Sequence, residues 1–273
     1  MENIEIVVHT AAMKHVDISE YNPFEAVKTN VLGLQNVIDA AIDACADRLV
    51  FTSSDKAVDP ANTMGTTKLL GEKLVTAGNK YRGPSGLVLA GVRFGNVLDS
   101  SQSVVPRFRR QIREGGPVII TDGEMSRFFL TYDDIVDLVT TAVTRTEGGE
   151  VFVRKMDAIR IGDLAEAMID WVAPQYGHDP AEIPVEYIGP RLGETMHEKI
   201  MTEREATRAL ESGATYAIPP ETRADGYLSH DGIDGFEPAE EIVRCSERAR
   251  HLAPSEIVDL LEANGLGMGG RRD

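Results

Sequence analysis

The sequence alternates short apolar runs with longer amphipathic segments, and this alternation constrains the fold more than any other feature. Residues 4–12 (IEIVVHTAA) form one apolar run, as expected of a strand buried on both faces. A helix is predicted from Asn22-Pro23 to about residue 45, because proline suits the first helical position. Two more strands are predicted at 48–53 and 87–93, with a helix at 63–80 between them. The alternation predicts an α/β fold whose parallel sheet carries helices on both faces.

The pattern of apolar and polar residues changes after Phe94. Residues 95–103 are a polar loop, and the segment beyond residue 176 is more broken. The spacing of apolar residues predicts helices at 105–113, 132–144, 161–176 and 255–264, and short strands at 118–121, 150–154 and 185–188. The tail GLGMGGRRD is expected to be frayed. The length of 273 residues fits one large domain, or a domain with a smaller appendage.

The charge balance narrows the function classes. The chain has 44 acidic and 28 basic residues, a formal net charge of −16, and its basic residues comprise 20 Arg and only 8 Lys. This disfavours non-specific binding to nucleic acid or to an anionic membrane. A small anionic ligand is still allowed, since it needs only a local cluster of cations. The acidic, Lys-poor composition suggests a salt-adapted organism, with an ordinary acidic cytosolic enzyme as the alternative.

The sequence contains few features that indicate a cellular compartment or a metal site. The N-terminus has no basic segment of a secretory signal, and no apolar run is long enough to cross a membrane. Cys45 and Cys245 have no zinc-site spacing, so each is predicted to be a small buried apolar residue in a reducing cytoplasm. His197-Glu198 begins like a zinc-protease motif, but Met201 stands where the second His is needed. No metal site is expected, and neither a P-loop nor a G-x-G-x-x-G that follows a strand is present.

One segment carries candidate chemistry. Ser54, Asp55 and Lys56 follow the strand at 48–53, at the end of a parallel sheet where catalytic groups gather. Met64 and Lys68 are spaced i, i+4 and therefore share one face of the next helix. The alternative interpretation, a polar loop followed by a surface lysine, is equally compatible with these residues alone.

Six strings in order point to a known family. They are HTAAMKHV (9–16), NPFEAVKTNVLG (22–33), SSDKAVDPANTMGTTK (53–68), VRFGNVLDSSQSVVPRFRRQI (92–112), MSRFF (125–129) and RLGETMHEKIMTE (191–203). The chain resembles the extended short-chain dehydrogenase/reductases, in the branch of capsular-polysaccharide-type UDP-N-acetylglucosamine 4,6-dehydratases and C4-epimerases. The resemblance spans roughly residues 4–220.

The resemblance implies a Rossmann-like fold and a particular domain organisation. Residues 1–175 would be an NAD(P)-binding domain that carries a substrate-binding insert at about 95–130. Residues 176–273 would be mainly a small substrate-binding subdomain and the C-terminal tail. HTAAMKHV belongs to the family's fourth strand, so the first β-α-β-α-β portion, with its glycine-rich phosphate loop, is expected to be missing. A late-called start codon or a truncated gene is the preferred explanation.

The resemblance also implies a reaction. Enzymes of this branch bind NADP or NAD and oxidise C4 of the sugar, and the keto group then acidifies the hydrogen on C5. Loss of that proton and of water from C6 completes a 4,6-dehydration, a lyase reaction that can be accompanied by inversion at C5. Without water loss, the same first step gives a C4-epimerase, an isomerase.

Catalytic roles carry over residue by residue. The family's usual catalytic Tyr is Met64 here, and a thioether cannot accept the sugar hydroxyl proton. Met also occurs at this position in some branches. Lys68 is expected to reach the nicotinamide ribose, Asp55 to be the general acid for the C6 hydroxyl, Lys56 the base at C5, and Ser54 to hydrogen-bond the O4 region. Lys56 would need a lowered pKa, through burial or through Lys68.

Cofactor and substrate contacts follow in the same way. Ala11 and Ala12 match small residues that pass the cofactor, and Asn30 matches an Asn that orders the active site; packing and a helix-surface Asn are the respective alternatives. Lys14 and His15 receive no role. The predicted UDP-sugar contacts are Asn96, Arg127 and Arg191 for the diphosphate, Glu194 for the ribose, and Val105 and Pro106 beside the uracil. Without the resemblance, each Arg would be taken as a solvated surface residue.

Two other interpretations stay open. The chain could be a UDP-sugar C4-epimerase, or a catalytically inactive fragment or UDP-sugar-binding module. A homo-oligomer is expected from the family alone, with no nucleic acid partner and no membrane span.

Overall fold

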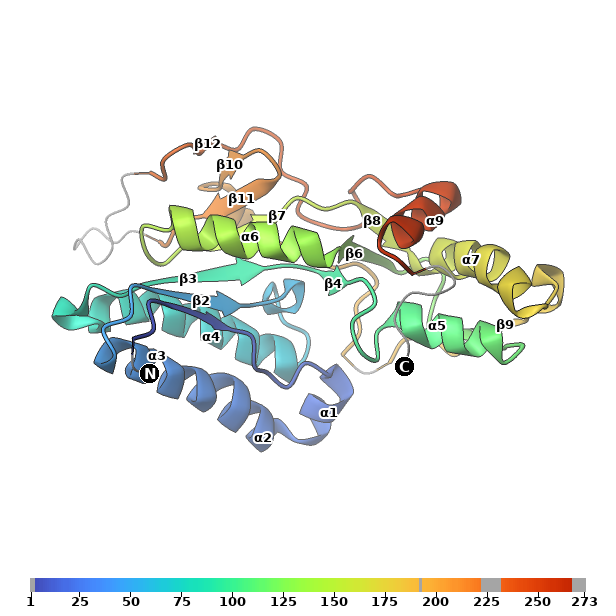
Figure 1. Ribbon diagram of the computed structural model, residues 1–273, viewed down its shortest axis with the longest axis horizontal. Coiled ribbons are helices and arrows are strands. Elements are labelled where there is room, and N and C mark those ends of the chain that lie inside the picture. Colours follow the sequence, from blue (N-terminus) through green and yellow to red (C-terminus); the bar gives the residue numbers. More distant parts are fainter. Residues whose placement is uncertain (1–2, 192, 222–231, 267–273) are drawn as a thin grey trace. The chain divides into compact units, whose positions relative to one another are not determined.

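The computed structural model describes residues 3–191, 193–221 and 232–266 (Figure 1). These residues form two compact units that interleave along the chain. Unit 1 comprises 1–94, 133–155 and 199–244, and unit 2 comprises 95–132, 156–198 and 245–273. This division differs from the single boundary near residue 175 suggested by the sequence, because the chain passes between the units five times.

Unit 1 is built on a seven-stranded sheet in the order β1-β2-β3-β7-β11-β10-β12. The first four strands are parallel and the last three are added antiparallel. The strands are β1 (Ile6–His9), β2 (Arg48–Thr52), β3 (Val88–Arg93), β7 (Val151–Arg154), β10 (Leu210–Ser212), β11 (Thr215–Ile218) and β12 (Glu237–Pro238). The α/β class with a mostly parallel sheet is confirmed.

Helices cover both faces of this sheet (Figure 1). Side chains alternate along β2, so Leu49 and Phe51 pack under α3 and α4, whereas Val50 packs toward α6. The helices of unit 1 are α1 (Val16–Tyr21), α2 (Pro23–Val27), α3 (Gly33–Asp43), α4 (Thr63–Tyr81), α6 (Tyr132–Arg145) and α8 (Glu203–Ala206), with a π-helical turn at Lys28–Leu32 and 3₁₀ turns at Asp55–Ala57 and Gly83–Ser85. The helix predicted at 22–45 is therefore α2 and α3 joined through the π-helical turn.

Strand β1 differs from its prediction. It covers four residues rather than nine, and it is an edge strand that pairs only with β2. Ile6 and Val8 are more than 40% exposed (49% and 43%), so the expected burial on both faces is wrong for the residues that the structure describes. Strands in the middle of a sheet, with helices over both faces, are the ones that become fully buried. Strand β1 lies at the edge and has a neighbouring strand on one side.

Unit 2 contains short strands and three main helices around an apolar cluster. Phe108 and Ile112 of α5 pack there with Leu164 and Met168 of α7 and Ile257 of α9. Its elements are β4 (Asn96–Val97), α5 (Val104–Arg113), β5 (Val118–Ile120), β6 (Ser126–Leu130), β8 (Ala158–Arg160), α7 (Ile161–Val172), 3₁₀ turns at Ala173–Tyr176 and Pro180–Glu182, β9 (Val185–Tyr187) and α9 (Pro254–Ala263). Strands β4, β6 and β8 form one sheet, and β5 and β9 form another.

The predicted burial of the two cysteines can also be checked against the structure. Cys45 is exposed and Cys245 is half-buried, so the prediction that both are buried is wrong. Among the described residues, no helix is long and apolar enough to span a bilayer. Residues 267–273 of the predicted frayed tail lie outside the described residues.

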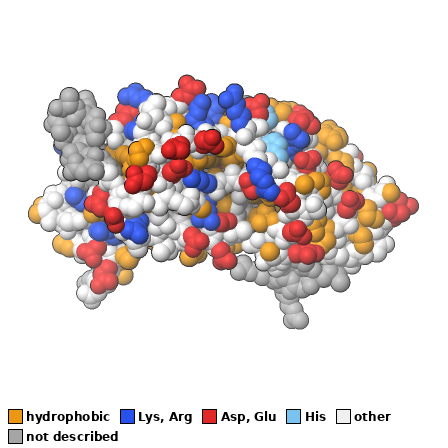
Figure 2. All heavy atoms as spheres, turned by 90° about the horizontal axis from the view of Figure 1, so that it is seen from above, with side chains coloured by type: hydrophobic (Ala, Val, Ile, Leu, Met, Phe, Trp, Pro, Cys, Tyr) orange, Lys and Arg blue, Asp and Glu red, His pale blue; other side chains and the backbone are white. Residues whose placement is uncertain are grey.

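On the face drawn in Figure 2, Lys and Arg side chains are dispersed among Asp and Glu.

Candidate functional site

The turn after β2 concentrates polar contacts on one carboxylate. Asp55 Oδ1 accepts hydrogen bonds from Ser54 Oγ (2.6 Å), the Lys56 amide (2.8 Å) and Lys56 Nζ (3.1 Å). The Asp55 side chain is fully buried, whereas that of Lys56 is 23% exposed. Asp55 Oδ2 is also buried and has no hydrogen-bond partner within the described part of the chain. This turn therefore pairs a buried acid with an accessible amine and leaves one carboxylate oxygen unused.

The first turn of α4 holds this segment in place. Asn62 caps the helix by accepting a hydrogen bond from the Gly65 amide at 2.8 Å. A Cβ at Gly65 would lie 2.1 Å from the Lys56 carbonyl oxygen, so only glycine allows the helix to approach this closely. Met64, in the family's Tyr position, is buried.

Lys68 is buried under the sheet edge rather than exposed. Its Nζ donates to the Thr52 carbonyl oxygen (2.8 Å) and lies 4.8 Å from the centroid of the Phe51 ring. Burial lowers the pKa of Lys68 to about 8, although the charge of Glu72 acts in the opposite direction. The surface-lysine interpretation is therefore wrong.

His9 ends β1 beside this lysine. Its ring stacks on Phe51, with centroids 6.2 Å apart, and its buried Nε2 has no hydrogen-bond partner among the described residues. Burial, and then the charge of Lys68, lower the pKa of His9. The sequence analysis gave this residue no role.

Asn30 connects the loop after β1 to α4. Its side-chain oxygen accepts from the Met13 amide (2.7 Å), and its Nδ2 donates to the Met13 carbonyl oxygen (3.1 Å) and to Thr67 Oγ1 (2.9 Å). It is 2% exposed and lies in the π-helical turn, a feature common near functional sites. The helix-surface alternative is wrong, and an ordering role remains the proposal. Ala11 is exposed and Ala12 is half-buried at the end of β1.

A buried ion cluster in unit 1 was missed by the sequence analysis. Arg93 ends β3, is 1% exposed and uses all five of its N–H donors. These donors bond both carboxylate oxygens of Glu72 and of Glu205, and the Ile200 carbonyl oxygen. Glu72 Oε1 also accepts from Ser53 Oγ at 2.5 Å, so the cluster reaches the residue before Ser54. The sequence feature that could have indicated this cluster is the arginine at the end of an otherwise apolar predicted strand.

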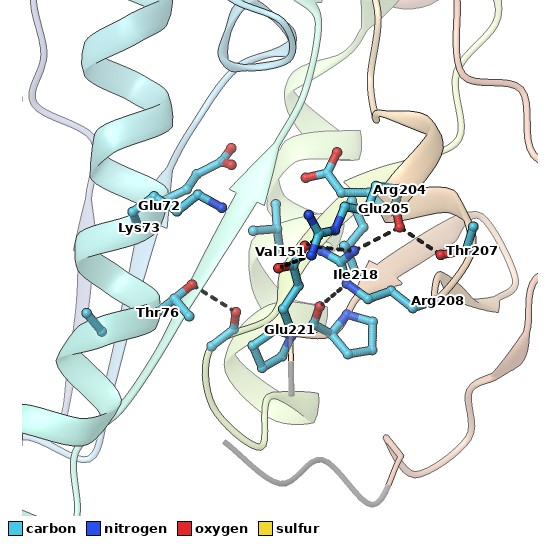
Figure 3. Close-up of a pocket in the computed structure, with 14 residues that line it drawn as sticks. Glu72, Lys73, Thr76, Val151, Arg204, Glu205, Thr207, Arg208, Ile218 and Glu221 are labelled. Atoms are coloured by element: carbon cyan, nitrogen blue, oxygen red, sulfur yellow. Dashed lines mark hydrogen bonds and ion pairs between the residues drawn. The ribbon is translucent and has the colours of Figure 1, made fainter. Parts of the chain in front are cut away.

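A pocket of about 700 Å³ opens beside this cluster and is lined by residues of α4, α8 and the end of β11 (Figure 3). Arg204 and Arg208 both pair with Glu221 there, and the two carboxylates of the ion cluster form part of the wall. None of the predicted site residues lines this pocket. The two guanidinium groups share the Glu221 carboxylate, which weakens the attraction of this pocket for an anion.

The predicted substrate contacts of unit 2 are partly committed to other partners. Arg127 lies 3.4 Å from Glu198 and donates to the Ser126 and Met196 carbonyl oxygens, so its guanidinium braces the 196–198 segment. Asn96 Nδ2 donates to the Phe128 carbonyl oxygen.

The rest of this group varies in exposure. Arg191 and Glu194 are exposed, and Glu194 Oε2 accepts from the Arg191 amide at 3.0 Å. Val105 is fully buried in the apolar cluster of unit 2, while Pro106 is half-buried.

The predicted residues therefore separate by unit. Those expected to act on the cofactor or in catalysis all belong to unit 1, and those expected to contact UDP all belong to unit 2. Within the described ranges, no group of acidic, His and Cys side chains could hold a metal ion.

The mostly parallel sheet with helices on both faces defines a Rossmann-like α/β protein. A sequence model of the polysaccharide biosynthesis protein family matches residues 1–220. The chain belongs to this family.

Relatives at similar identity carry different names. An uncharacterized membrane protein of Methanocaldococcus jannaschii is 40% identical over 262 residues, or 96% of this chain and 75% of the relative. A UDP-N-acetylglucosamine 4,6-dehydratase (inverting) of Campylobacter jejuni is 40% identical over 221 residues, or 81% and 63%. A UDP-glucose 4-epimerase of Rickettsia typhi is 37% identical over 230 residues, or 84% and 65%. The matched region thus spans less than two thirds of the dehydratase and of the epimerase.

Among solved structures, Pen from Bacillus thuringiensis matches with a TM-score of 0.89 and 40% identity, covering 97% of this chain and 77% of that one. MoeE5, solved in complex with UDP-glucuronic acid and NAD, matches with a TM-score of 0.58 and 28% identity, covering 71% and 69%.

Proposed function

We propose that this chain provides the catalytic acid–base pair and the sugar-nucleotide contacts for 4,6-dehydration of UDP-N-acetylglucosamine in polysaccharide biosynthesis. The observation that carries the proposal is the contact of 3.1 Å between Lys56 Nζ and Asp55 Oδ1 on a fully buried carboxylate. The Campylobacter relative, named a UDP-N-acetylglucosamine 4,6-dehydratase (inverting), supports the same substrate class.

The pair can exist in two protonation states of equal total charge. As an ion pair it consists of an ammonium and a carboxylate, and transfer of one proton along the contact gives a neutral amine and a carboxylic acid. The neutral state contains both groups that the reaction needs, a base for the C5 proton and an acid for the departing C6 oxygen.

Elimination then restores the ion pair. Lys56 takes the C5 proton, Asp55 protonates the C6 hydroxyl, and water leaves, so protons balance and no external acid is consumed. Ser54 lies 2.6 Å from Asp55 Oδ1 and is proposed to hydrogen-bond the sugar O4. The unpaired Asp55 Oδ2 is free to face the substrate.

A nicotinamide dinucleotide would supply the hydride acceptor and donor at C4 and C6. The residues proposed to hold its nicotinamide end are Ala11, Ala12 and Lys68, ordered by Asn30. The small side chains at the end of β1 and the orphaned His9 Nε2 nearby are compatible with a polar ring at this position. NAD and NADP are distinguished by the absorbance and mass of whatever dinucleotide co-purifies with the protein or is taken up when added.

The test uses UDP-N-acetylglucosamine with added NAD or NADP in D₂O. A dehydratase gives a 4-keto-6-deoxy product with deuterium at C5, read by NMR. Lys56→Ala and Asp55→Asn should lower turnover at least 100-fold while UDP-sugar still binds, and Lys199→Ala, an exposed lysine that pairs with Asp59, should retain it. Near-normal turnover by Lys56→Ala would refute the assignment.

A C4-epimerase is the second candidate, favoured by the Rickettsia relative at 37% identity. It would convert the same substrate to the UDP-galactosamine derivative without incorporating deuterium at C5. The D₂O experiment therefore separates the two functions in one spectrum.

A further inference from the structure

A buried serine hydroxyl at the end of β2 is bonded to the ion cluster of unit 1. Ser53 lies between β2 and the turn at 54–56, and its Oγ donates to Glu72 Oε1 at 2.5 Å. The two residues are 3% and 4% exposed. Arg93 already holds both oxygens of Glu72, through Nε at 3.0 Å and Nη2 at 2.6 Å. The charge of Glu72 is therefore compensated without the hydroxyl, and Ser53 is bonded to a carboxylate whose position an ion pair fixes.

The backbone around Ser53 is held by the end of β3. The Ser53 amide donates to the Val92 carbonyl oxygen (2.7 Å), and the Asp55 amide donates to the Phe94 carbonyl oxygen (3.0 Å). Arg93 lies between these two acceptors in the sequence, and its guanidinium group is connected to Ser53 Oγ through the carboxylate on α4. Backbone and side-chain contacts thus form a closed chain from β3 through α4 to the end of β2.

Extended backbone converts the serine bond into control of the next side chain. Ser54 has φ −149° and ψ 157°, so the side chains of Ser53 and Ser54 point to opposite sides of the chain. Ser54 Oγ donates to Asp55 Oδ1, and Lys56 Nζ contacts the same oxygen. A rotation of the strand end that breaks the bond to Glu72 would turn Ser54 as well and displace it from Asp55.

We propose that Ser53 and Glu72 are positioning residues for the dehydration, which fix the rotation of the strand end and so orient the turn at 54–56 toward the sugar. The inference rests on the proposed function and deepens it. Burial leaves neither residue a surface for direct contact with substrate, so both act through the turn. If the hydroxyl only stabilised the fold, its loss would lower stability without a specific loss of turnover.

The first test removes the hydroxyl of Ser53 and then restores it in another residue. With UDP-N-acetylglucosamine and added NAD or NADP, Ser53→Ala should lower kcat by about tenfold or more, about 1.4 kcal/mol in activation free energy, and leave KM within about twofold. Ser53→Thr keeps a hydroxyl that can donate to Glu72, and its kcat should stay within about threefold of wild type.

Thr146 offers a matched control in the same unit. Its hydroxyl donates to Glu150 Oε2 at 2.5 Å, and it is 5% exposed. Glu150 precedes β7, so this bond lies at the opposite edge of the parallel strands from the turn at 54–56. Thr146→Val should lower the urea midpoint as Ser53→Ala does but keep the wild-type kcat. Wild-type kcat in Ser53→Ala, or an equal loss in Ser53→Thr, would overturn the inference.

Chemical labelling follows the turn without any turnover. The Lys56 side chain is 23% exposed beside Asp55, so acylation by an N-hydroxysuccinimide ester, mapped by peptide mass spectrometry, measures how far the turn shields its amine. Labelling of Lys56 relative to the exposed Lys199 should rise about threefold or more in Ser53→Ala and stay unchanged in Thr146→Val.

The two measurements separate the inference from the proposed function. Unchanged labelling of Lys56 in Ser53→Ala would overturn the inference, whatever the turnover of wild type. Increased labelling together with a wild type that does not convert the UDP-sugar would refute the proposed function, and the orientation of the turn by Ser53 and Glu72 would still hold.

Discussion

Two buried cations of unit 1, Arg93 and Lys68, have pKa values shifted in opposite directions. Arg93 is surrounded by Glu72 and Glu205, so its charge is compensated and its pKa is raised despite burial. Among the described residues, Lys68 has a carbonyl oxygen and an aromatic ring as its direct partners, and burial lowers its pKa to about 8. A buried cation in an environment like that of Lys68 destabilises the folded state whenever it is protonated.

Lys68 should therefore impose a pH dependence on stability. Between about pH 8 and 10.5 the unfolded chain binds the Lys68 proton and the folded chain does not, so the free energy of unfolding should rise with pH. The full effect is about 3 kcal/mol relative to Lys68→Met, in which this titration is absent. Urea unfolding at pH 7, 8, 9 and 10 measures it.

The control for this series is Lys73→Met, which removes an exposed lysine from the same helix. It should keep the wild-type slope, since solvent screens its charge. Parallel curves for wild type and Lys68→Met would contradict the assignment.

At the scale of elements, the strongly periodic segments were predictable. Strand β2, strand β3 and helix α4 lie within about one residue of their predicted bounds, because burial imposes a regular apolar pattern on them. Strands β8, β10 and β12 were missed because two or three residues carry no period and pair with distant segments. Strand β6 was recognised only as a family string.

Site prediction had a similar limit. Ser54, Asp55 and Lys56 are adjacent in sequence and were found. The Arg93 cluster joins residues up to 112 positions apart, so no local sequence pattern displays it.

The contact between α4 and the turn that contains Lys56 predicts the effect of a single methyl group. Gly65→Ala would place Cβ against the Lys56 carbonyl oxygen, so the turn or the helix must shift; we expect a loss of 1–3 kcal/mol in stability and at least a tenfold drop in dehydratase turnover, about 1.4 kcal/mol. Gly33→Ala, whose Cβ would meet its nearest atom at 3.5 Å, is the control and should be neutral or stabilising by up to about 1 kcal/mol. Urea unfolding and steady-state kinetics measure both.

The ion cluster that joins β3, α4 and α8 should be costly to break. Arg93→Met leaves the buried Glu72 carboxylate and the half-buried Glu205 carboxylate without their counter-ion, and we expect a loss of about 3–5 kcal/mol in urea unfolding. Arg250→Met, which removes exposed ion pairs with Asp157 and Glu256, should lower the stability far less. Equal effects of the two substitutions would show that the cluster contributes no more than a surface pair.

Acid should weaken the same cluster. Burial tends to raise the pKa of Glu205, but the hydrogen bonds and charge of Arg93 lower it to about 2. The folded carboxylate is thus favoured above its ordinary pKa, and this stability is lost as pH falls from about 4.5 toward 2. The acid-induced loss between these values should be smaller in Arg93→Met than in wild type.

At the scale of the whole molecule, neither unit is a continuous stretch of chain. A fragment of residues 1–175 matches the domain predicted from sequence, but it lacks β11, which pairs with β7, and Glu205, which pairs with Arg93. We expect this fragment to show no cooperative urea transition, whereas the full chain does. A cooperative transition in the fragment, read by circular dichroism and fluorescence together, would contradict this expectation.

The interleaving also affects the nascent chain on the ribosome. Arg93 emerges 112 residues before Glu205, which at about 5–20 residues per second is a delay of roughly 6–20 s. During that interval the guanidinium group has only one of its two carboxylates, and β7 has no partner on the β11 side. The order of synthesis therefore leaves an incomplete sheet exposed in the growing polypeptide, which makes this protein a candidate client for chaperones that hold nascent chains.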